Sequence, residues 1–296
     1  MNINAQGFHG PLAPHSRRKS KYAPRTVPVS ETGAALTPSA LIASLAAAGR
    51  ETDAAPFGQA NAREGFVPFA TTYAVCASRR AYDFIVMAIA EEALPVKIVC
   101  ALPGLTTGYG PSHQATEDLA IFRGMPGLTI VDPCDATEIA QAVPAIAAHP
   151  GPVYMRLLRG KVPDVLSRYG YQFEVGKAKL IRDGKDVLFV STGFMTMRTL
   201  DAAEALAKDG IDAAVLHVPT IKPLDAETII GEASKGGRLV VTAENHTVIG
   251  GLGEAVAATL MRAGVHVPFR QVGLPDEFLD AGALPTLHNQ YGISVD

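Results

Sequence analysis

A glycine-rich loop over residues 102–114 carries the side chains best suited to chemistry. It reads Leu-Pro-Gly-Leu-Thr-Thr-Gly-Tyr-Gly-Pro-Ser-His-Gln, so Tyr109, Ser112 and His113 lie close together in it. A buried-strand pattern at 96–102 precedes the loop, and ligands bind parallel α/β sheets where strands end. A histidine presented there, beside the start of a helix, suits a polar or anionic substrate. The alternative is an ordinary strand-to-helix turn with a capping serine.

Two arginines lie at the carboxyl end of another predicted strand, 152–158. Arg159 follows Arg156 by three residues, and we expect it to point across the same crevice as His113. A guanidinium fork in that place suits bidentate binding of a phosphate group. The spacing fits equally well two charges that an edge strand exposes to solvent.

Three further residues recur at a spacing of three where a turn enters a helix. They are Tyr73, Cys76 and Arg79, and this spacing predicts that they share one side of the turn. The functional interpretation is a half-apolar pocket for a flat ring. The alternative is packing beside a solvated arginine.

The segment Glu244–Glu254 also follows a strand and opens a helix. It contains three glycines but matches neither the dinucleotide-binding nor the P-loop pattern. We therefore predict that its glycines allow close packing of helix on strand, and that His246 is a structural hydrogen-bonding residue.

The elements that must position these residues alternate between strand and helix. This order predicts an α/β protein of two consecutive doubly wound domains with parallel, helix-covered sheets. Strands are predicted at 96–102, 128–131, 152–158, 186–191, 213–217, 238–243 and 269–272. Helices are predicted from residue 37, at 78–90, from 194 to 209, at 225–233 and at 253–263. The predicted organisation is a disordered tail at 1–34, a first domain at 35–160, a linker at 161–170 and a second domain at 171–296.

Composition excludes several classes of function. The 296 residues carry a net charge of −3, which gives no support for nucleic-acid binding or a membrane-surface role. No apolar run is long enough to cross a membrane. The three cysteines show no pairing or metal-binding spacing, so we expect a cytoplasmic protein. The tail has five basic residues without an apolar secretion signal, which leaves a weak targeting peptide as its alternative reading.

Taken together, the motifs resemble transketolases. Phe66–Tyr73, Arg80–Asp83 and Gly110–Gln114 look like the pyrimidine-binding domain, and Glu117–Arg123 and Gly151–Arg156 extend the likeness. The second unit resembles the transketolase C-terminal domain, so the resemblance covers the chain from about Pro38 to its end. Its length is similar to that of the C-terminal subunit of a split transketolase.

This resemblance implies transfer of a two-carbon ketol unit between sugar phosphates with thiamine diphosphate. The family's pyrophosphate-binding domain holds the diphosphate and Mg²⁺ through a Gly-Asp-Gly and Asn motif, which this sequence lacks. The resemblance therefore implies a partner, an N-terminal transketolase subunit that binds Mg²⁺, in a homodimer or heterotetramer. By position, Tyr73, Cys76 and Arg79 would border the cofactor ring and His113 the reacting carbons. Tyr109, Ser112, His113 and Arg159 would bind substrate.

Three features depart from the family pattern. Cys76 stands where an aromatic residue usually packs the pyrimidine, and Tyr109 replaces an acid that reads a sugar hydroxyl. The family's catalytic glutamate, in a Gly-[Ile/Met]-x-Glu-[Gln/His] context upstream of the 66–69 strand, is missing. Glu64 does not match that motif. The missing piece would be a strand–helix–strand–helix segment, on the order of 60 residues long, so the first domain is expected to be truncated.

Two other readings stay open from the sequence. The chain could be a non-catalytic scaffold or remnant whose C-terminal domain still docks a partner. It could also be a β-subunit of a 2-oxo acid dehydrogenase, which shares the architecture. The Gly-Pro-Ser-His-Gln loop and Arg159 favour sugar phosphates over the second of these.

Overall fold

Two five-stranded sheets form the framework of the protein. The computed structural model describes residues 54–160 and 162–295, so the predicted tail and the helix from residue 37 lie outside the described residues. The first sheet has the strand order β1-β2-β4-β3-β8 and the second β10-β9-β6-β7-β5. The strands are β1 (Phe69–Tyr73), β2 (Lys97–Ala101), β3 (Thr129–Val131), β4 (Val153–Leu157), β5 (Lys179–Arg182), β6 (Val187–Ser191), β7 (Ala213–His217), β8 (Thr220–Lys222), β9 (Leu239–Thr247) and β10 (Phe269–Leu274).

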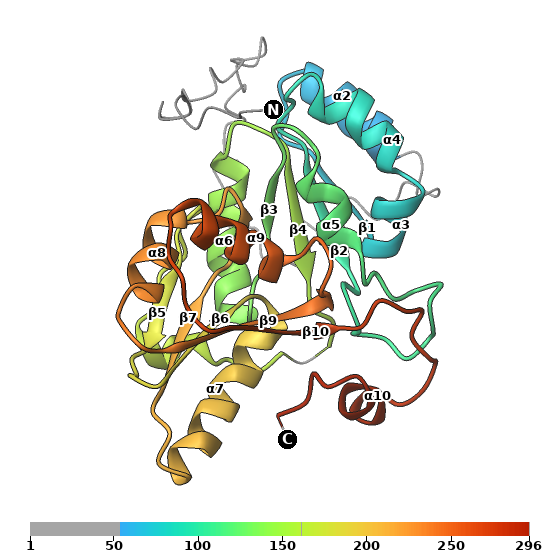
Figure 1. Ribbon diagram of the computed structural model, residues 1–296. Coiled ribbons are helices and arrows are strands. Elements are labelled where there is room, and N and C mark those ends of the chain that lie inside the picture. Colours follow the sequence, from blue (N-terminus) through green and yellow to red (C-terminus); the bar gives the residue numbers. More distant parts are fainter. Residues whose placement is uncertain (1–53, 161, 296) are drawn as a thin grey trace, which may run out of the picture.

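Helices connect these strands and pack against the sheets (Figure 1). The α-helices are α2 (Ala54–Arg63), α3 (Ala74–Arg79), α4 (Tyr82–Ile85), α5 (Asp118–Arg123), α6 (Ala136–Ala148), α7 (Phe194–Lys208), α8 (Ala226–Ala233), α9 (Leu252–Arg262) and α10 (Leu284–Gln290). A π-helical segment, η1 (Val86–Ala90), continues α4, and a 3₁₀ turn, η2 (Leu166–Tyr169), lies between the two halves. Within the described ranges, no helix is long and apolar enough to span a bilayer.

The prediction of two α/β units is confirmed, but their sheets are mixed rather than wholly parallel. In the second sheet, β5 pairs antiparallel with β7. In the first, β8 from the second half of the chain pairs antiparallel with β3. Because β8 closes the first sheet, the two halves share a structural element as well as an interface.

The helix predicted at 78–90 is wrong in its continuity. Helix α3 begins earlier, at Ala74, and ends at Arg79. The backbone N–H groups of Arg80 and Ala81 both donate to the carbonyl of Cys76, which closes α3 before α4 begins. The apolar spacing predicts that Ala81, Phe84, Ile85, Ala88 and Ile89 face inward. Ala81, Ile85 and Ile89 are buried, but Phe84 is 42% exposed.

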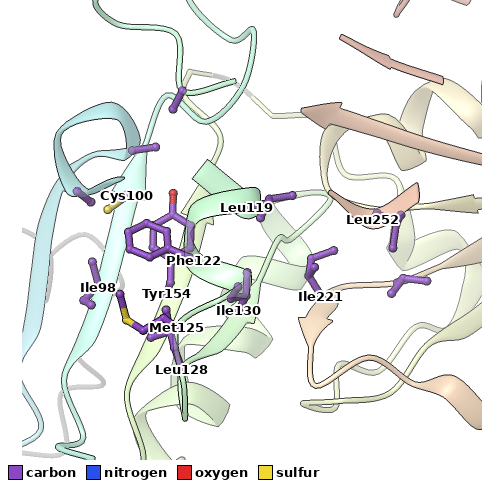
Figure 2. Packing of buried hydrophobic residues seen from close by; sticks show 14 of the residues in the cluster. Ile98, Cys100, Leu119, Phe122, Met125, Leu128, Ile130, Tyr154, Ile221 and Leu252 are labelled. Atoms are coloured by element: carbon purple, nitrogen blue, oxygen red, sulfur yellow. The ribbon is translucent and has the colours of Figure 1, made fainter. Parts of the chain in front are cut away.

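A continuous apolar core joins the first sheet to the second half of the chain. Its centre holds the rings of Phe122 and Tyr154, which pack at a tilt with their centroids 4.4 Å apart. Figure 2 shows this pair between Ile98 and Leu119, with Ile221 and Leu252 farther along the same cluster. Because large side chains from both halves bury one another, the core fixes the two units in one arrangement.

Candidate functional site

The candidate site lies at the carboxyl ends of three neighbouring parallel strands. Tyr73 ends β1, the loop with His113 follows β2, and Arg159 lies two residues beyond β4. These strands are adjacent in the order β1-β2-β4. The sheet therefore brings Tyr73 and the His113 loop to one edge, as the strand-end rule predicts.

Aromatic rings flank His113 on two sides. The ring of Tyr73 meets it edge-on at 6.0 Å between centroids, and that of Tyr109 meets it edge-on at 5.7 Å. Ser112 Oγ lies 3.0 Å from His113 Nδ1. Tyr73 is 40% exposed and Tyr109 64% exposed, and His113 between them is itself part-exposed. Four residues predicted for the site thus lie in one cluster: Tyr73, Tyr109, Ser112 and His113.

Arg79 binds the backbone of the loop that carries His113. Its guanidinium donates to the carbonyl of Pro111 at 2.8 Å and to that of Gln114 at 3.2 Å. It also forms an ion pair with Glu117. Burial raises the pKa of Glu117, but the hydrogen bond and charge of Arg79 outweigh burial and hold that pKa below its usual value. Arg79 therefore acts on the loop that carries His113, a role the sequence spacing did not indicate.

Cys76 points away from the cluster. Its side chain is 2% exposed and packs in the main apolar core. Tyr73 has extended backbone angles at the start of α3, so helical spacing does not relate its direction to that of Cys76. Of the three residues predicted to border a ring, only Tyr73 presents an exposed aromatic face beside His113.

The two arginines of the β4 segment have different environments. Arg159 is exposed, and none of the contacts among described residues joins it to the His113 loop. Arg156 is 2% exposed and binds Asp118 through two bonds of 3.0 and 3.1 Å. It also donates to Asp132 at 2.9 Å and to the carbonyl of Asn245 at 3.0 Å. Arg156 is therefore the centre of a buried ion network rather than a solvent-exposed edge charge.

The carboxylates of Asp118 and Asp132 compensate the positive charge of Arg156, which is buried away from water. Burial lowers the pKa of the Arg156 guanidinium, but Asp118 and Asp132 more than reverse this effect and raise it overall. Burial raises the pKa of Asp132 despite the attraction of Arg156. Tyr154 donates to Asp118 at 2.6 Å. Because Asp118 begins α5 directly after the loop, the network fixes where the loop ends.

The second half of the chain holds the other side of the loop. Asn245 accepts a hydrogen bond from Leu105 N at 2.8 Å through Oδ1. Gly282 N donates to the carbonyl of Gly108 at 3.0 Å, and Gln114 Nε2 donates to that of Asp280 at 3.0 Å. The loop is thus tied at its start, middle and end by residues far away in sequence. Sequence analysis missed these contacts because no local pattern encodes them.

Gly104 lies where the loop packs closely against the second half of the chain. It has φ +57°, and a Cβ there would lie 2.1 Å from the backbone carbonyl oxygen of Asn245. We expect Gly104→Ala to lower the free energy of unfolding by about 2–3 kcal/mol, from left-handed strain plus overpacking. Gly127→Ala is the matched control, since Gly127 has φ +73° and no atom within 4 Å of its built Cβ. It should cost only about 1–2 kcal/mol, and equal losses in urea unfolding would contradict the expectation.

The Glu244–Glu254 segment packs as the sequence suggests. Glu244 accepts from Leu252 N at 2.6 Å and Gly253 N at 2.8 Å, and burial raises its pKa to about 7. His246 Nε2 accepts from Ala120 N at 3.2 Å, and its Nδ1 lies 2.7 Å from the carbonyl of Thr247. Burial lowers the pKa of His246 to about 4, so the ring is neutral near pH 7. His246 thereby joins the two halves, and both residues are fully buried.

The described residues fit only part of a flat, charged cofactor. Tyr73 offers a half-exposed ring face against which a heteroaromatic ring can pack. The described ranges hold no group of three or more His, Cys, Asp or Glu side chains that could bind a metal ion.

Family comparisons agree with this geometry. Residues 50–164 match the transketolase pyrimidine-binding domain, and residues 176–296 match the transketolase C-terminal domain. The first match contains the strand ends and loop of the candidate site. The second contains the residues that support the loop.

Individual relatives are similar along most of their length. A transketolase family protein of Sinorhizobium fredii is 76% identical over 235 residues, which cover 79% of this chain and 68% of the relative. A 6-deoxy-6-sulfo-D-fructose transketolase subunit of a Clostridium species is 42% identical, covering 78% of this chain and 71% of that subunit.

Solved structures share the architecture. A split-gene transketolase, described as an inactive β4 tetramer, superposes with a TM-score of 0.77 and 37% identity, covering 83% of this chain and 78% of that one. Transketolase of Pichia stipitis in complex with sedoheptulose 7-phosphate superposes with a TM-score of 0.67 and 20% identity, covering 83% and 35%, and shows the fold alone. The two matched domains and the extended identity to these relatives establish that the chain belongs to the transketolase family.

Proposed function

We propose that this chain is the C-terminal-type subunit of a split transketolase. Its reaction would be the transfer of a two-carbon ketol unit between sugar phosphates, with thiamine diphosphate as cofactor. A partner subunit with the pyrophosphate-binding domain would hold the diphosphate and Mg²⁺. The observation that carries this proposal is the Tyr73, Tyr109 and His113 cluster at the carboxyl edge of the pyrimidine-domain sheet.

Each residue would have a distinct task. Tyr73 would pack against the cofactor's ring, and Arg79 would hold the loop through Pro111 and Gln114. His113 would hydrogen-bond substrate hydroxyls or move a proton, with Ser112 at its Nδ1. Arg159, exposed beyond β4, would bind the substrate phosphate.

The cofactor supplies the carbon nucleophile for ketol transfer, and the transketolase family is thiamine diphosphate-dependent. This chain would supply the ring's apolar neighbour and the substrate's polar contacts. Cys76 stays a predicted cofactor neighbour only through the family pattern, because its side chain is buried. The relative described as a β4 tetramer supports a further part of the proposal, that this chain also associates with itself.

Calorimetry of thiamine diphosphate binding tests the proposal. The titration uses the full chain with Mg²⁺ and the pyrophosphate-binding subunit of a split transketolase, and we expect saturable binding that requires both subunits. Tyr73→Ala should weaken binding about two- to twelvefold, the equivalent of an aromatic contact of about 0.5–1.5 kcal/mol. Met261→Ala is the control, since Met261 is 67% exposed on α9, and it should bind like the unchanged chain.

A second function is favoured by one feature of the sequence. The catalytic glutamate motif of the family is missing, which suits a non-catalytic scaffold that still docks a partner. A folded chain that associates with the partner but binds no thiamine diphosphate would support the scaffold and overturn the catalytic proposal.

A further inference from the structure

Strand β1 is an edge strand of the first sheet, as far as the structure describes that sheet. Among the described residues its hydrogen-bonded neighbour is β2 alone, in a parallel register that places Phe69 opposite Lys97. Lys97 N donates to the carbonyl of Pro68 at 2.8 Å, so the even-numbered residues of β1 bond to β2. The N–H and C=O groups of Phe69, Thr71 and Tyr73 therefore point away from the sheet.

This edge lacks the protection that the other edge strands have. Strands β5, β8 and β10 each carry a lysine or arginine, and each has a register shift against its neighbour. Such charges and irregularities discourage pairing with another strand. Strand β1 reads Phe-Ala-Thr-Thr-Tyr, without charge or proline, and pairs with β2 in an unbroken register. Among the described residues no strand pairs with its outer edge, so a further strand can join there.

Apolar side chains are exposed along the same stretch of chain. Four of the nine large hydrophobic residues that the described structure exposes fall between residues 66 and 87: Phe66 at 50%, Tyr73 at 40%, Phe84 at 42% and Met87 at 56%. Soluble proteins rarely gather such side chains without a partner to cover them.

We propose that the β1 edge binds the β1 edge of a second copy of this chain, antiparallel about a two-fold axis at Thr71. An edge placed against itself in this way is self-complementary. In this register Thr71 faces its own counterpart, and Phe69 faces Tyr73 of the other copy, so all three outward-facing residues are paired. The charges beside β1 also favour the antiparallel direction. Exposed Glu64 precedes the strand and exposed Arg80 follows it, so opposite charges of the two copies would lie on the same side of the interface. The inference rests on the self-association within the proposed function and names its surface.

A disulfide across the axis tests the register. Paired residues of antiparallel strands have Cα atoms about 5.5 Å apart, within the range that a disulfide spans. Thr71→Cys should give a covalent dimer on non-reducing gels after mild oxidation, because the native Cys76, Cys100 and Cys134 are buried. Ser167→Cys is the matched control, on the exposed turn η2, and should stay uncrosslinked. A Thr71→Cys chain that also stays uncrosslinked overturns the proposal.

Light scattering of a second pair of variants tests the backbone hydrogen bonds that would join the two β1 strands. Thr71→Pro removes the outward N–H, a change that edge strands tolerate, and should reduce the particle mass about twofold. Thr71→Ala keeps the N–H and should leave the mass unchanged. Unchanged mass for a folded Thr71→Pro chain overturns the interface, whereas a monomeric unchanged chain overturns self-association altogether. Calorimetry of the unchanged chain with the partner subunit measures cofactor binding separately, so failure of the interface and failure of the proposed function can be distinguished.

Discussion

Arg156→Met should lower the free energy of unfolding by about 3–5 kcal/mol, the usual cost of removing one partner from a buried ion pair. Methionine fills much of the space but leaves Asp118 and Asp132 without their shared cation. Both carboxylates are buried, at 0% and 3% exposure, so water cannot replace the guanidinium. Since domains of this kind are stable by only about 5–15 kcal/mol, the loss should be plain in urea unfolding followed by circular dichroism.

The control for this prediction lies three residues away. Arg159 is exposed beyond the end of β4, so Arg159→Met should change stability by no more than about 0.5 kcal/mol. Arg156→Lys separates charge from geometry. It keeps the cation but cannot reproduce the bidentate bond to Asp118, so it should lie between the unchanged chain and Arg156→Met. A loss below about 1 kcal/mol for Arg156→Met would show that the network is not what holds this region together.

Whether the sequence predicts a strand of this fold depends on whether that strand is buried and apolar or short and charged. The buried strands β2, β4, β6, β7 and β9 each contain a short run of apolar residues, which local pattern identifies. Strands β5 and β8 are short and carry Lys179, Arg182 and Lys222. Their strand state comes from pairing with distant segments, β7 and β3. No local signal could show that β8 belongs to the first sheet.

The residues of the candidate site also differ in how well the sequence predicts their positions. Tyr73 and His113 could be brought together from the sequence because both follow strands of one parallel sheet. The role of Arg79 could not, since its partners Pro111, Gln114 and Glu117 lie more than 30 residues away. Helical spacing predicts that Cys76 shares one side with Tyr73 and Arg79, but this spacing fails at Tyr73, which precedes α3 with extended backbone angles.

Glu64 illustrates why the missing motif matters. It is the only acid in the described residues before β1 and lies at the end of α2. Tyr73 ends β1, beyond the opposite end of that strand. A five-residue strand spans about 17 Å, so Glu64 cannot reach a ring packed on Tyr73. Among the described residues, Glu64 is therefore not positioned to substitute for the family's catalytic glutamate.

Ketol transfer by this chain, with its partner, Mg²⁺ and thiamine diphosphate, should be about 10²–10⁴-fold slower than that of a split transketolase that carries the glutamate motif, the usual contribution of one positioned proton-transfer group. Exchange of the cofactor's C2 proton, followed by nuclear magnetic resonance under conditions where calorimetry shows saturation, isolates this step from substrate binding. We expect binding without accelerated exchange. The matched comparison is a glutamate-bearing subunit whose motif glutamate is changed to glutamine, which should show the same slow exchange. Rapid exchange and robust turnover by the unchanged chain would show that another residue takes the proton, and Glu64→Gln would then identify or exclude Glu64.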